Sequence, residues 1–259
     1  MFSRRHSLKT LVAAAAFPAA AKAAAAVREG GDKPVRLVVL DVGGTIIQDH
    51  GEVPDAMHNA LAKHGVTVSF AEIAEWRGAS KRGMVRHFVE LRTKPDVNRE
   101  ALSEAIYNDF STQVNAAYAN VQPIAGAEDA IRKLRQAGYL LATTTGFDRP
   151  LTEAIFRRLG WRDHFVATVT SDDVVDGRPS PFMLFHAMEQ AHVDSVAEVV
   201  AVGDTPLDLQ AAANAGVRGI IGVYSGAATE ERLGREPHTQ ILPSVAGLPA
   251  LLQAKFPPG

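Results

Sequence analysis

The stretch VRLVVLDVGGT, residues 35–45, decides how the rest of the chain folds. Its first six residues form a nearly continuous apolar run, which is typical of a strand buried on both faces of a sheet. The run ends at Asp41, and Gly43 and Gly44 then allow the backbone to bend sharply. Because ligands of open parallel sheets bind beyond the carboxyl ends of the strands, Asp41 is the first candidate for a functional carboxylate.

Short apolar runs of the same kind recur downstream and alternate with helical periodicity. The runs cover 139–144, 165–170, 199–202 and 219–223. Apolar residues at helical spacing predict helices over 127–138, 151–159, 181–191 and 207–215. Strands that alternate with helices indicate βαβ units with right-handed crossovers. The sequence therefore predicts an α/β protein with a Rossmann-like parallel sheet core.

The interval 53–121 breaks this rhythm, because it contains no convincing strand. Its apolar spacing predicts four helices, over 54–64, 70–76, 80–91 and 99–117. We therefore expect an all-helical cap at 53–121, inserted into a core that comprises residues 27–52 and 122–259. A cap that closes over the sheet edge would exclude bulk water and limit the size of the substrate.

Residues 1–26 have the three-part layout of an export signal. Arg4, Arg5 and Lys9 form a basic start, an alanine-rich apolar run follows, and small residues near Ala24 offer cleavage sites. The start is similar to a twin-arginine signal, and the run is shorter than the ~20 apolar residues of a membrane anchor. We expect a periplasmic or otherwise exported protein with no membrane contact after signal removal. A frayed helix on a cytoplasmic protein is the alternative.

The composition of the 259 residues excludes several classes of protein. With 46% hydrophobic and 22% charged residues, the chain resembles a globular protein rather than a disordered, collagen-like or coiled-coil one. A net charge of -2 provides no overall basic field for nucleic acid, so we expect no nucleic-acid partner. The absence of cysteine excludes disulfides, thiolate metal sites and cysteine nucleophiles within this chain.

Carboxylates, a hydroxyl and a cation follow the predicted strands and should meet at one edge of the sheet. They are Asp41, Thr145, Arg178, Asp204 and Asp208. Mg²⁺ prefers hard oxygen ligands and usually takes one or two carboxylates together with substrate phosphate and water. Thr145 can hold phosphate oxygens, and Arg178 can neutralise charge on a transferring phosphoryl group. The pattern predicts a magnesium–phosphate site in which a carboxylate can also attack phosphorus.

The same residues resemble the four motifs of the haloacid dehalogenase superfamily over residues 35–225. The motifs read Asp41-x-x-Gly44-Thr45, Thr145, Arg178 and Gly203-Asp204-x-x-x-Asp208. The resemblance implies that Asp41 is the nucleophile and a metal ligand. It implies that the Gly43 carbonyl, Asp204 and Asp208 complete the Mg²⁺ site. It further implies that phosphate is bound by Gly44, Thr45, Thr145, Gly146 and Arg178.

One position departs from the phosphatases of this superfamily. They usually carry a second aspartate two positions after the nucleophile, as general acid and base, whereas this chain has Gly43 there. The phosphonoacetaldehyde hydrolase (phosphonatase) branch has a small residue at that position. Phe147 stands where that branch usually has tyrosine, and Arg178 lies in the Gly-Arg-Pro setting that the branch shares. The chain therefore resembles the phosphonatase-like branch.

Lys81, at the end of the stretch 78–81, resembles the lysine with which that branch forms a Schiff base. A protonated imine accepts electrons, so carbon could leave phosphorus without an acid on the leaving group. Such a lysine needs a lowered pKa, which Arg77 and Arg82 would support if they pointed inward. Met84 stands near the position of the histidine that accompanies this lysine in the branch. Contact with phosphate and simple solvation are the alternative roles for Lys81.

Three further residues have two candidate roles each. Asp49 follows the first motif and lines either the cap hinge or a solvated turn, and we favour the turn. Asp173 is a candidate to orient Arg178 or to support the metal site. Trp76 either shapes the substrate pocket or anchors the cap helices, and we favour the anchor.

These observations favour a Mg²⁺-dependent hydrolase that cleaves a small phosphonate, similar to phosphonoacetaldehyde, through an aspartyl phosphate at Asp41. One alternative is a phosphomonoesterase for a small metabolite, similar to phosphoglycolate phosphatase. Another is an exported protein that binds metal or phosphate without catalysis, with Gly43 as the sign of lost activity. The branch resembled often forms dimers through its cap, which makes a homodimer one expectation.

Overall fold

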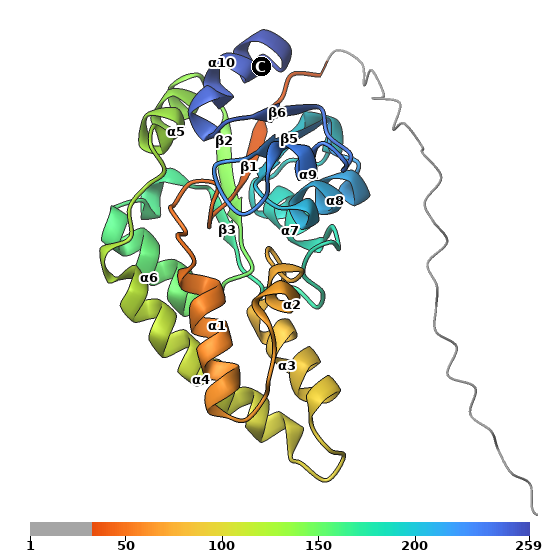
Figure 1. Cartoon of the computed structure of the whole chain (residues 1–259). Helices are drawn as coiled ribbons and strands as arrows, with labels where there is room; N and C mark the ends of the chain where they lie inside the picture. The colour runs from red at the N-terminus through yellow and green to blue at the C-terminus, as the bar shows by residue number, and fades with distance from the viewer. Residues whose placement is uncertain (1–32) are drawn as a thin grey trace, which may run out of the picture.

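The computed structural model describes residues 33–259, so the predicted export signal lies outside the described part of the chain. Six parallel strands form one sheet in the order β3-β2-β1-β4-β5-β6 (Figure 1). The strands are β1 Leu37–Asp41, β2 Leu140–Thr144, β3 Ala167–Val169, β4 Val199–Gly203, β5 Gly219–Val223 and β6 Gln240–Leu242. The chain is thus an α/β protein with a Rossmann-like parallel sheet, as the sequence predicts.

Helices cover both faces of this sheet, because alternate residues of each strand face opposite sides. Leu37 and Val39 pack in one apolar cluster with residues of α7 and α8, whereas Val38 and Leu40 pack in the other with residues of α5, α6 and α10. The helices of the core are α5 Ala127–Gln136, α6 Arg149–Leu159, α7 Phe182–Gln190, α8 Pro206–Ala215, α9 Glu230–Leu233 and α10 Leu248–Lys255. Burial on both faces explains the continuous apolar runs in the sequence.

An all-helical cap is inserted between β1 and β2. Its helices are α1 Glu52–Lys63, α2 Phe70–Ala74, α3 Lys81–Arg92 and α4 Arg99–Ala117. They lie beyond the carboxyl ends of the strands (Figure 1). The Ser80 hydroxyl accepts a hydrogen bond from the Gly83 amide, so α3 begins at Lys81. The Lys81 amide donates to the Gly146 carbonyl at 3.3 Å, which places the start of α3 against the loop after β2.

Some elements near the carboxyl terminus are absent from the prediction. The strand β6 has only three residues, all half-buried at the edge of the sheet, so it carries no alternating pattern. Helix α9 has four residues, too few to show helical periodicity. Helix α10 is stabilised by burial of Leu248 and Leu252 against the core, a tertiary effect that local spacing does not reveal.

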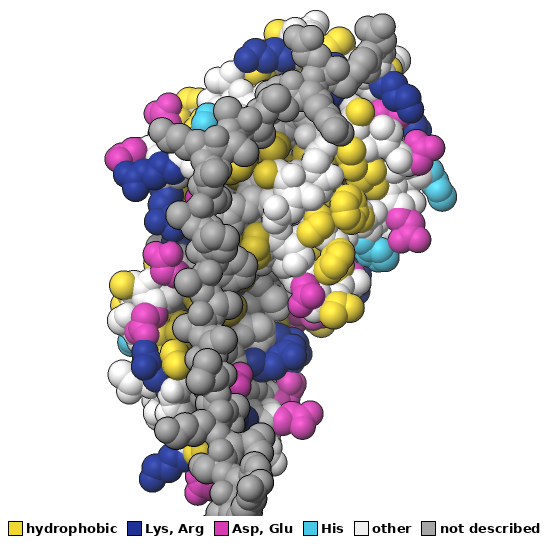
Figure 2. All heavy atoms as spheres, turned by 90° about the vertical axis from the view of Figure 1, so that its right-hand side faces the viewer, with side chains coloured by type: hydrophobic (Ala, Val, Ile, Leu, Met, Phe, Trp, Pro, Cys, Tyr) yellow, Lys and Arg dark blue, Asp and Glu magenta, His cyan; other side chains and the backbone are white. Residues whose placement is uncertain are grey.

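The surface has both apolar and charged regions. Figure 2 shows hydrophobic side chains gathered on one face of the molecule, with charged side chains around them. Phe182 and Phe185 of α7 are nearly half exposed, and Val175 in the preceding loop is almost fully exposed. Within the described residues, no helix has the length and apolar character needed to cross a membrane.

Candidate active site

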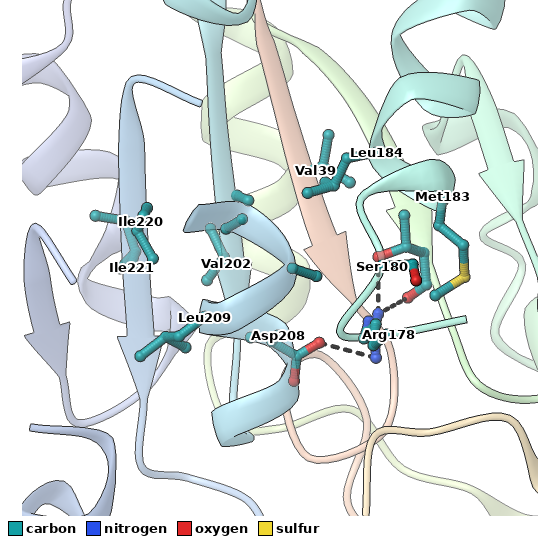
Figure 3. A pocket seen from close by; sticks show the side chains of 15 residues that line it. Val39, Arg178, Ser180, Met183, Leu184, Val202, Asp208, Leu209, Ile220 and Ile221 are labelled. Carbon is teal, nitrogen blue, oxygen red and sulfur yellow. Dashed lines mark hydrogen bonds and ion pairs between the residues drawn. The ribbon is translucent and has the colours of Figure 1, made fainter. Parts of the chain in front are cut away.

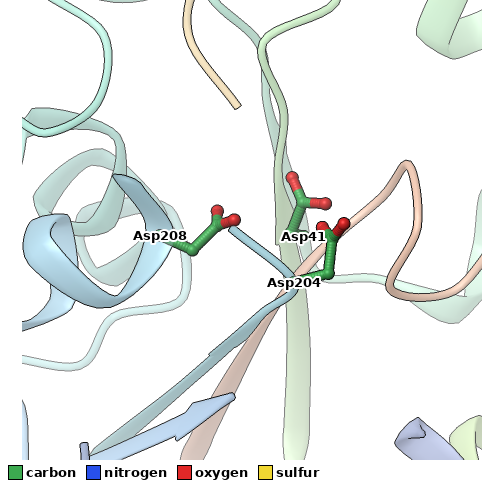
Figure 4. A group of neighbouring side chains, drawn as sticks. All are labelled: Asp41, Asp204 and Asp208. Carbon is green, nitrogen blue, oxygen red and sulfur yellow. The ribbon is translucent and has the colours of Figure 1, made fainter. Parts of the chain in front are cut away.

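Three aspartates meet where the strand order changes direction, between β1 and β4. Asp41 ends β1, Asp204 follows β4, and Asp208 lies in the first turn of α8 (Figure 4). One carboxylate oxygen from each lies within 4.8 Å of the other two, and all three residues are buried. The predicted convergence of these carboxylates at one sheet edge therefore occurs, at the place where α/β proteins bind ligands.

Hydrogen bonds hold two of these carboxylates in place. Asp204 accepts from the Thr45 hydroxyl at 3.3 Å and from the Ala227 amide at 2.6 Å. Asp208 accepts from the amide and the hydroxyl of Thr205, at 3.0 and 2.5 Å. Thr205 and Asp208 form the capping box that begins α8, so the helix start itself orients the Asp208 carboxylate. The cluster is thus built before any ligand arrives.

The cluster has the donor chemistry of a magnesium site. Burial raises the pKa of Asp204, and the neighbouring charges of Asp41 and Asp208 raise it further. Burial also raises the pKa of Asp208 to about 6, although Arg178 acts in the opposite direction. A divalent cation among these hard oxygens would relieve the repulsion and favour the ionised carboxylates. The residues present therefore fit Mg²⁺.

Arg178 lies beside this cluster and is fully engaged. Its Nη1 lies 2.7 Å from an oxygen of Asp41 and 2.8 Å from one of Asp208, the latter marked in Figure 3. Its Nη2 donates to the carbonyl and the hydroxyl of Thr144, both at 2.8 Å. The Nη1 also donates to the Gly78 carbonyl of the cap at 3.3 Å. The small cavity behind Arg178 that Figure 3 shows has a volume of only about 10 Å³, too little for a substrate.

A second cavity lies between the sheet edge and the cap and is the better candidate for the substrate. From the core it is lined by Asp41, Gly43, Thr145, Gly146, Arg178 and Asp204, which are six of the predicted site residues. From the cap it is lined by Lys81, the seventh. Its volume is about 40 Å³, so the cap is closed down onto the strand ends.

Lys81 is buried in this cavity, with 5% of its surface exposed, so its predicted alternative role as a solvated lysine is wrong. Its Nζ donates to the Ala79 carbonyl at 2.9 Å and lies 5.6 Å from the centre of the Phe147 ring. Burial lowers the pKa of Lys81 to about 8; Asp41 and Asp49 oppose this shift, and Arg178 and Arg77 support it. Burial thus makes the lysine a better nucleophile near neutral pH.

Two glycines allow the cap loop to approach the core this closely. A Cβ on Gly78 would lie 2.5 Å from the Thr205 hydroxyl, and Gly78 has a φ of +88°. A Cβ on Gly146 would lie 2.4 Å from the Ala79 carbonyl oxygen. Both distances are far below van der Waals contact, so a side chain at either position would push the cap away from the sheet.

The structure places some predicted residues elsewhere than expected. Gly44 and Thr45 pack against Asp204 and do not line the substrate cavity. A Cβ on Gly44 would lie 2.3 Å from an Asp204 oxygen, which explains the glycine there. The prediction that Asp173 orients Arg178 is wrong. Asp173 accepts hydrogen bonds from the amide and hydroxyl of Thr170 and pairs with a different arginine, Arg149, at 2.5 Å.

Trp76 packs against the cap rings of His87 and Phe88 and does not line the cavity, which agrees with the favoured anchor role. Arg77 points inward as the lysine requires. Arg82 does not, because it pairs with Glu104 on the outside of the cap.

Sequence reasoning missed several residues of the site. For Asp49 the favoured solvated turn is wrong and the cap-hinge alternative comes closer, because Asp49 lines the cavity and pairs with the cap residue Arg77, 28 positions along the chain. No local pattern links these two residues. Thr144 gives no distinctive signal, because threonine is common at the ends of strands. Thr205, in contrast, could have been found, since Thr205-x-x-Asp208 before an apolar helix has the form of a capping box.

An open parallel sheet with three clustered aspartates at its switch point and a helical cap above them forms an enclosed site that could hold a divalent cation and a small ligand. Residues 35–216 match the family model of haloacid dehalogenase-like hydrolases, and the chain belongs to this family. It is therefore a hydrolase, and the prediction of a non-catalytic binding protein loses its support.

Among curated relatives, the chain is 31% identical to a phosphonoacetaldehyde hydrolase of Nitratidesulfovibrio vulgaris, over 72% of this chain and 70% of the relative. It is 28% identical to a phosphoglycolate phosphatase of Cupriavidus necator, over 85% of this chain and 94% of the relative. A solved phosphonoacetaldehyde hydrolase-like protein of Oleispira antarctica has the same fold. Its TM-score is 0.74 at 22% identity, and the match covers 86% of this chain and 92% of that one.

Proposed function

We propose that this protein is a Mg²⁺-dependent, phosphonatase-like hydrolase that cleaves the P–C bond of a small aldehyde phosphonate such as phosphonoacetaldehyde. The observation that carries the proposal is the position of Lys81. A buried amine, with its pKa lowered to about 8, lines the same cavity as the Asp41 carboxylate. The name of the Nitratidesulfovibrio relative supports the same substrate.

In the first part of the proposed reaction, the neutral Lys81 amine attacks the substrate aldehyde. Loss of one water molecule then gives an imine, which becomes protonated on nitrogen. The iminium draws electrons from the neighbouring carbon, which is the carbon bonded to phosphorus. This activation explains how a carbon leaving group can depart without an acid at position 43.

In the second part, the Asp41 carboxylate attacks phosphorus and forms an aspartyl phosphate as the P–C bond breaks. The electron pair of that bond moves into the iminium and gives an enamine on Lys81. Protonation at carbon and addition of water release acetaldehyde and free the lysine. A second water hydrolyses the aspartyl phosphate to phosphate and Asp41. Overall, one water is consumed for each aldehyde and phosphate formed.

The metal and the remaining site residues would serve the phosphoryl group. Mg²⁺ held by Asp41, Asp204, Asp208 and the Gly43 carbonyl would supply charge neutralisation for the phosphoryl oxygens. Thr145 and Gly146 line the cavity next to Asp41, where their polar groups are placed to hold those oxygens. Arg178, held by Thr144, adds a fixed positive charge beside the nucleophile.

A phosphomonoesterase is the second candidate, and the similarity to the Cupriavidus phosphoglycolate phosphatase favours it. In that case Lys81 contacts the substrate as a cation, and water replaces the missing acid. The surroundings of Gly43 favour the phosphonatase over the phosphomonoesterase. A Cβ on Gly43 would lie 3.4 Å from the Phe147 ring, so a carboxylate side chain at this position would project toward an apolar ring. Such surroundings favour a reaction that needs no acid at position 43.

Borohydride trapping separates the two candidates. Wild-type protein incubated with phosphonoacetaldehyde and borohydride should acquire a stable adduct on Lys81, seen by mass spectrometry of the peptide. Lys81→Arg keeps the charge but cannot form the imine, so it should give no adduct and no acetaldehyde. Release of phosphate from p-nitrophenyl phosphate, with no adduct from phosphonoacetaldehyde, would establish the phosphomonoesterase instead.

A further inference from the structure

A charge pair in the substrate cavity takes part in no bond-forming or bond-breaking step of the proposed reaction, and its two charges act on the pKa of Lys81 in opposite directions. Arg77 of the cap loop donates from Nη2 to Asp49 Oδ2 at 2.7 Å, and Asp49 Oδ1 accepts from the Gly51 amide at 3.0 Å. The Asp49 side chain is 9% exposed and that of Arg77 is 27% exposed. Both residues line the cavity that holds Asp41 and Lys81. Two charges are thus largely withdrawn from water and neutralised by each other.

Apolar groups make up much of the wall around this pair. Val53 of α1, Ile73 of α2, Met84 of α3 and Phe147 of the core line the cavity and are all buried. None of these side chains can donate a hydrogen bond to an anion. An anionic group brought here would lose its hydration without replacement, at a cost in free energy.

The guanidinium groups that line the cavity are already engaged with carboxylates. Arg178 pairs with Asp41 and with Asp208, and Arg77 pairs with Asp49. The remaining cation is the Lys81 amine. If the phosphoryl group binds at the Asp41 end, the rest of the substrate extends among Lys81, the apolar wall and the Asp49–Arg77 pair.

We infer that the Asp49–Arg77 pair makes the cavity selective for substrates whose end distal to phosphorus is uncharged, such as an aldehyde, and disfavours a carboxylate at that end. Asp49 does this in two ways: it neutralises the cation that would bind a carboxylate, and it repels one directly. This inference rests on the proposed function in one respect, namely that the phosphoryl group binds next to Asp41. It names Asp49 and Arg77 as residues that determine specificity.

Two ligands of nearly the same shape test the inference without turnover. Phosphonoacetamide and phosphonoacetate differ in whether the end distal to phosphorus is neutral or negatively charged. Their dissociation constants are measured by isothermal titration calorimetry with Mg²⁺ at pH 9, where Lys81 is mostly neutral. Wild-type protein should bind phosphonoacetamide at least about tenfold more tightly, a difference of about 1.4 kcal/mol. Equal binding, or tighter binding of phosphonoacetate, overturns the inference.

The variant Asp49→Asn tests the residue. Asparagine keeps the size and an acceptor oxygen for the Gly51 amide but leaves the charge of Arg77 unbalanced. The variant should bind phosphonoacetate about tenfold more tightly than wild type, with phosphonoacetamide changed less than twofold. Adding Arg77→Gln to Asp49→Asn should remove this gain. An unchanged ratio in Asp49→Asn overturns the assignment.

The matched control is Asp109→Asn, the same substitution in the cap at an aspartate that pairs with Lys63 and His64 instead. It should leave both dissociation constants unchanged. The wild-type comparison needs no variant, so it decides the matter even if Asp49→Asn fails to fold. Failure of the proposed function appears separately, as an absent Lys81 adduct, and does not alter the calorimetric ratio.

Discussion

The core half and the cap half of the active site are built differently. On the core side, Asp204 and Asp208 each accept two hydrogen bonds from neighbouring residues, and Thr144 holds Arg178 through two more. On the cap side, the Lys81 amine makes one hydrogen bond, to the carbonyl of Ala79 in its own loop. The core half is rigidly specified, whereas the position of the cap half depends on how closely one loop approaches the sheet.

This difference assigns different tasks to the two halves. A fixed cluster of oxygens and a fixed guanidinium suit phosphoryl transfer, which requires the same geometry for every substrate of the class. The cap loop places the Lys81 amine and Arg77, paired with Asp49, in a cavity lined by apolar residues. These groups contact the part of the substrate distal to phosphorus and therefore determine which substrate binds. Substitutions of the core carboxylates should therefore abolish the reaction, as should loss of the Lys81 amine, whereas the other substitutions in the cap half should change its efficiency or its choice of substrate.

The largest effect is expected for Asp41→Asn in the core half. Asparagine has nearly the same shape but is a poor nucleophile and a weak metal ligand. Phosphate release should fall by roughly four orders of magnitude or more. Acid-quenched labelling with substrate phosphorus should no longer mark the protein as an acyl phosphate.

Asp109→Asn is again the control, since it removes the same charge on the outside of the cap. Its rate and labelling should equal those of wild type. If Asp41→Asn retained more than about a hundredth of the wild-type rate, Asp41 would not be the nucleophile, and the proposed division between the two halves would fail.

A smaller effect, on stability instead of activity, is expected for Lys81→Met in the cap half. The pKa of Lys81 falls from 10.5 in a solvated lysine to about 8 in the folded protein, chiefly through burial. Below pH 8 both states bind the proton, so the whole cost of burying the cation, roughly 3 kcal/mol, is present. Between pH 8 and 10.5 only the unfolded state keeps the proton, so folding becomes more favourable as the pH rises.

Lys81→Met should therefore increase the free energy of unfolding by roughly 3 kcal/mol at pH 7, and by much less at pH 10.5. Urea denaturation with a chelator present measures both values. The exposed Lys133→Met serves as the control and should change little. A variant less stable than wild type at pH 7 would show that the buried amine stabilises the cap, contrary to the expected cost of burying its charge.

The same division explains what the sequence could predict. Asp41, Arg178, Asp204 and Asp208 each follow a strand at the carboxyl edge, so chain order and strand periodicity sufficed to bring them together. The contact between Thr45 and Asp204 is long-range, and no spacing in the sequence encodes it.

The cap half was less predictable. The helices followed from their periodicity, but the Asp49–Arg77 pair depends on how the loop after β1 meets the loop before α3. Similarity of the motif around Asp173 does not reveal its partner, because the loop turns Asp173 back toward Thr170. Contacts between segments that pack only in the folded state are therefore the part that local patterns leave undetermined.

The smallest effect we predict concerns the contact between the two halves. In Gly146→Ala, the added methyl would lie 2.4 Å from the Ala79 carbonyl oxygen, so the cap loop must move back and carry Lys81 with it. The apparent kcat/KM should fall about tenfold because the amine is displaced from Asp41. The global stability should change little, since the cap helices keep their own packing.

Gly177→Ala provides a close comparison, because Gly177 faces the same cap loop, yet its added methyl would lie 3.7 Å from Ser80, an ordinary contact. Its kcat/KM should stay within about twofold of wild type. If Gly146→Ala were equally active, the cap loop would tolerate displacement, and cap position could not be what places Lys81. If both alanine variants lost activity equally, the loss would come from the glycine backbones themselves and not from the distance between cap and sheet. Only a loss confined to Gly146→Ala supports the conclusion that the cap half works by close approach to a core half that is already in place.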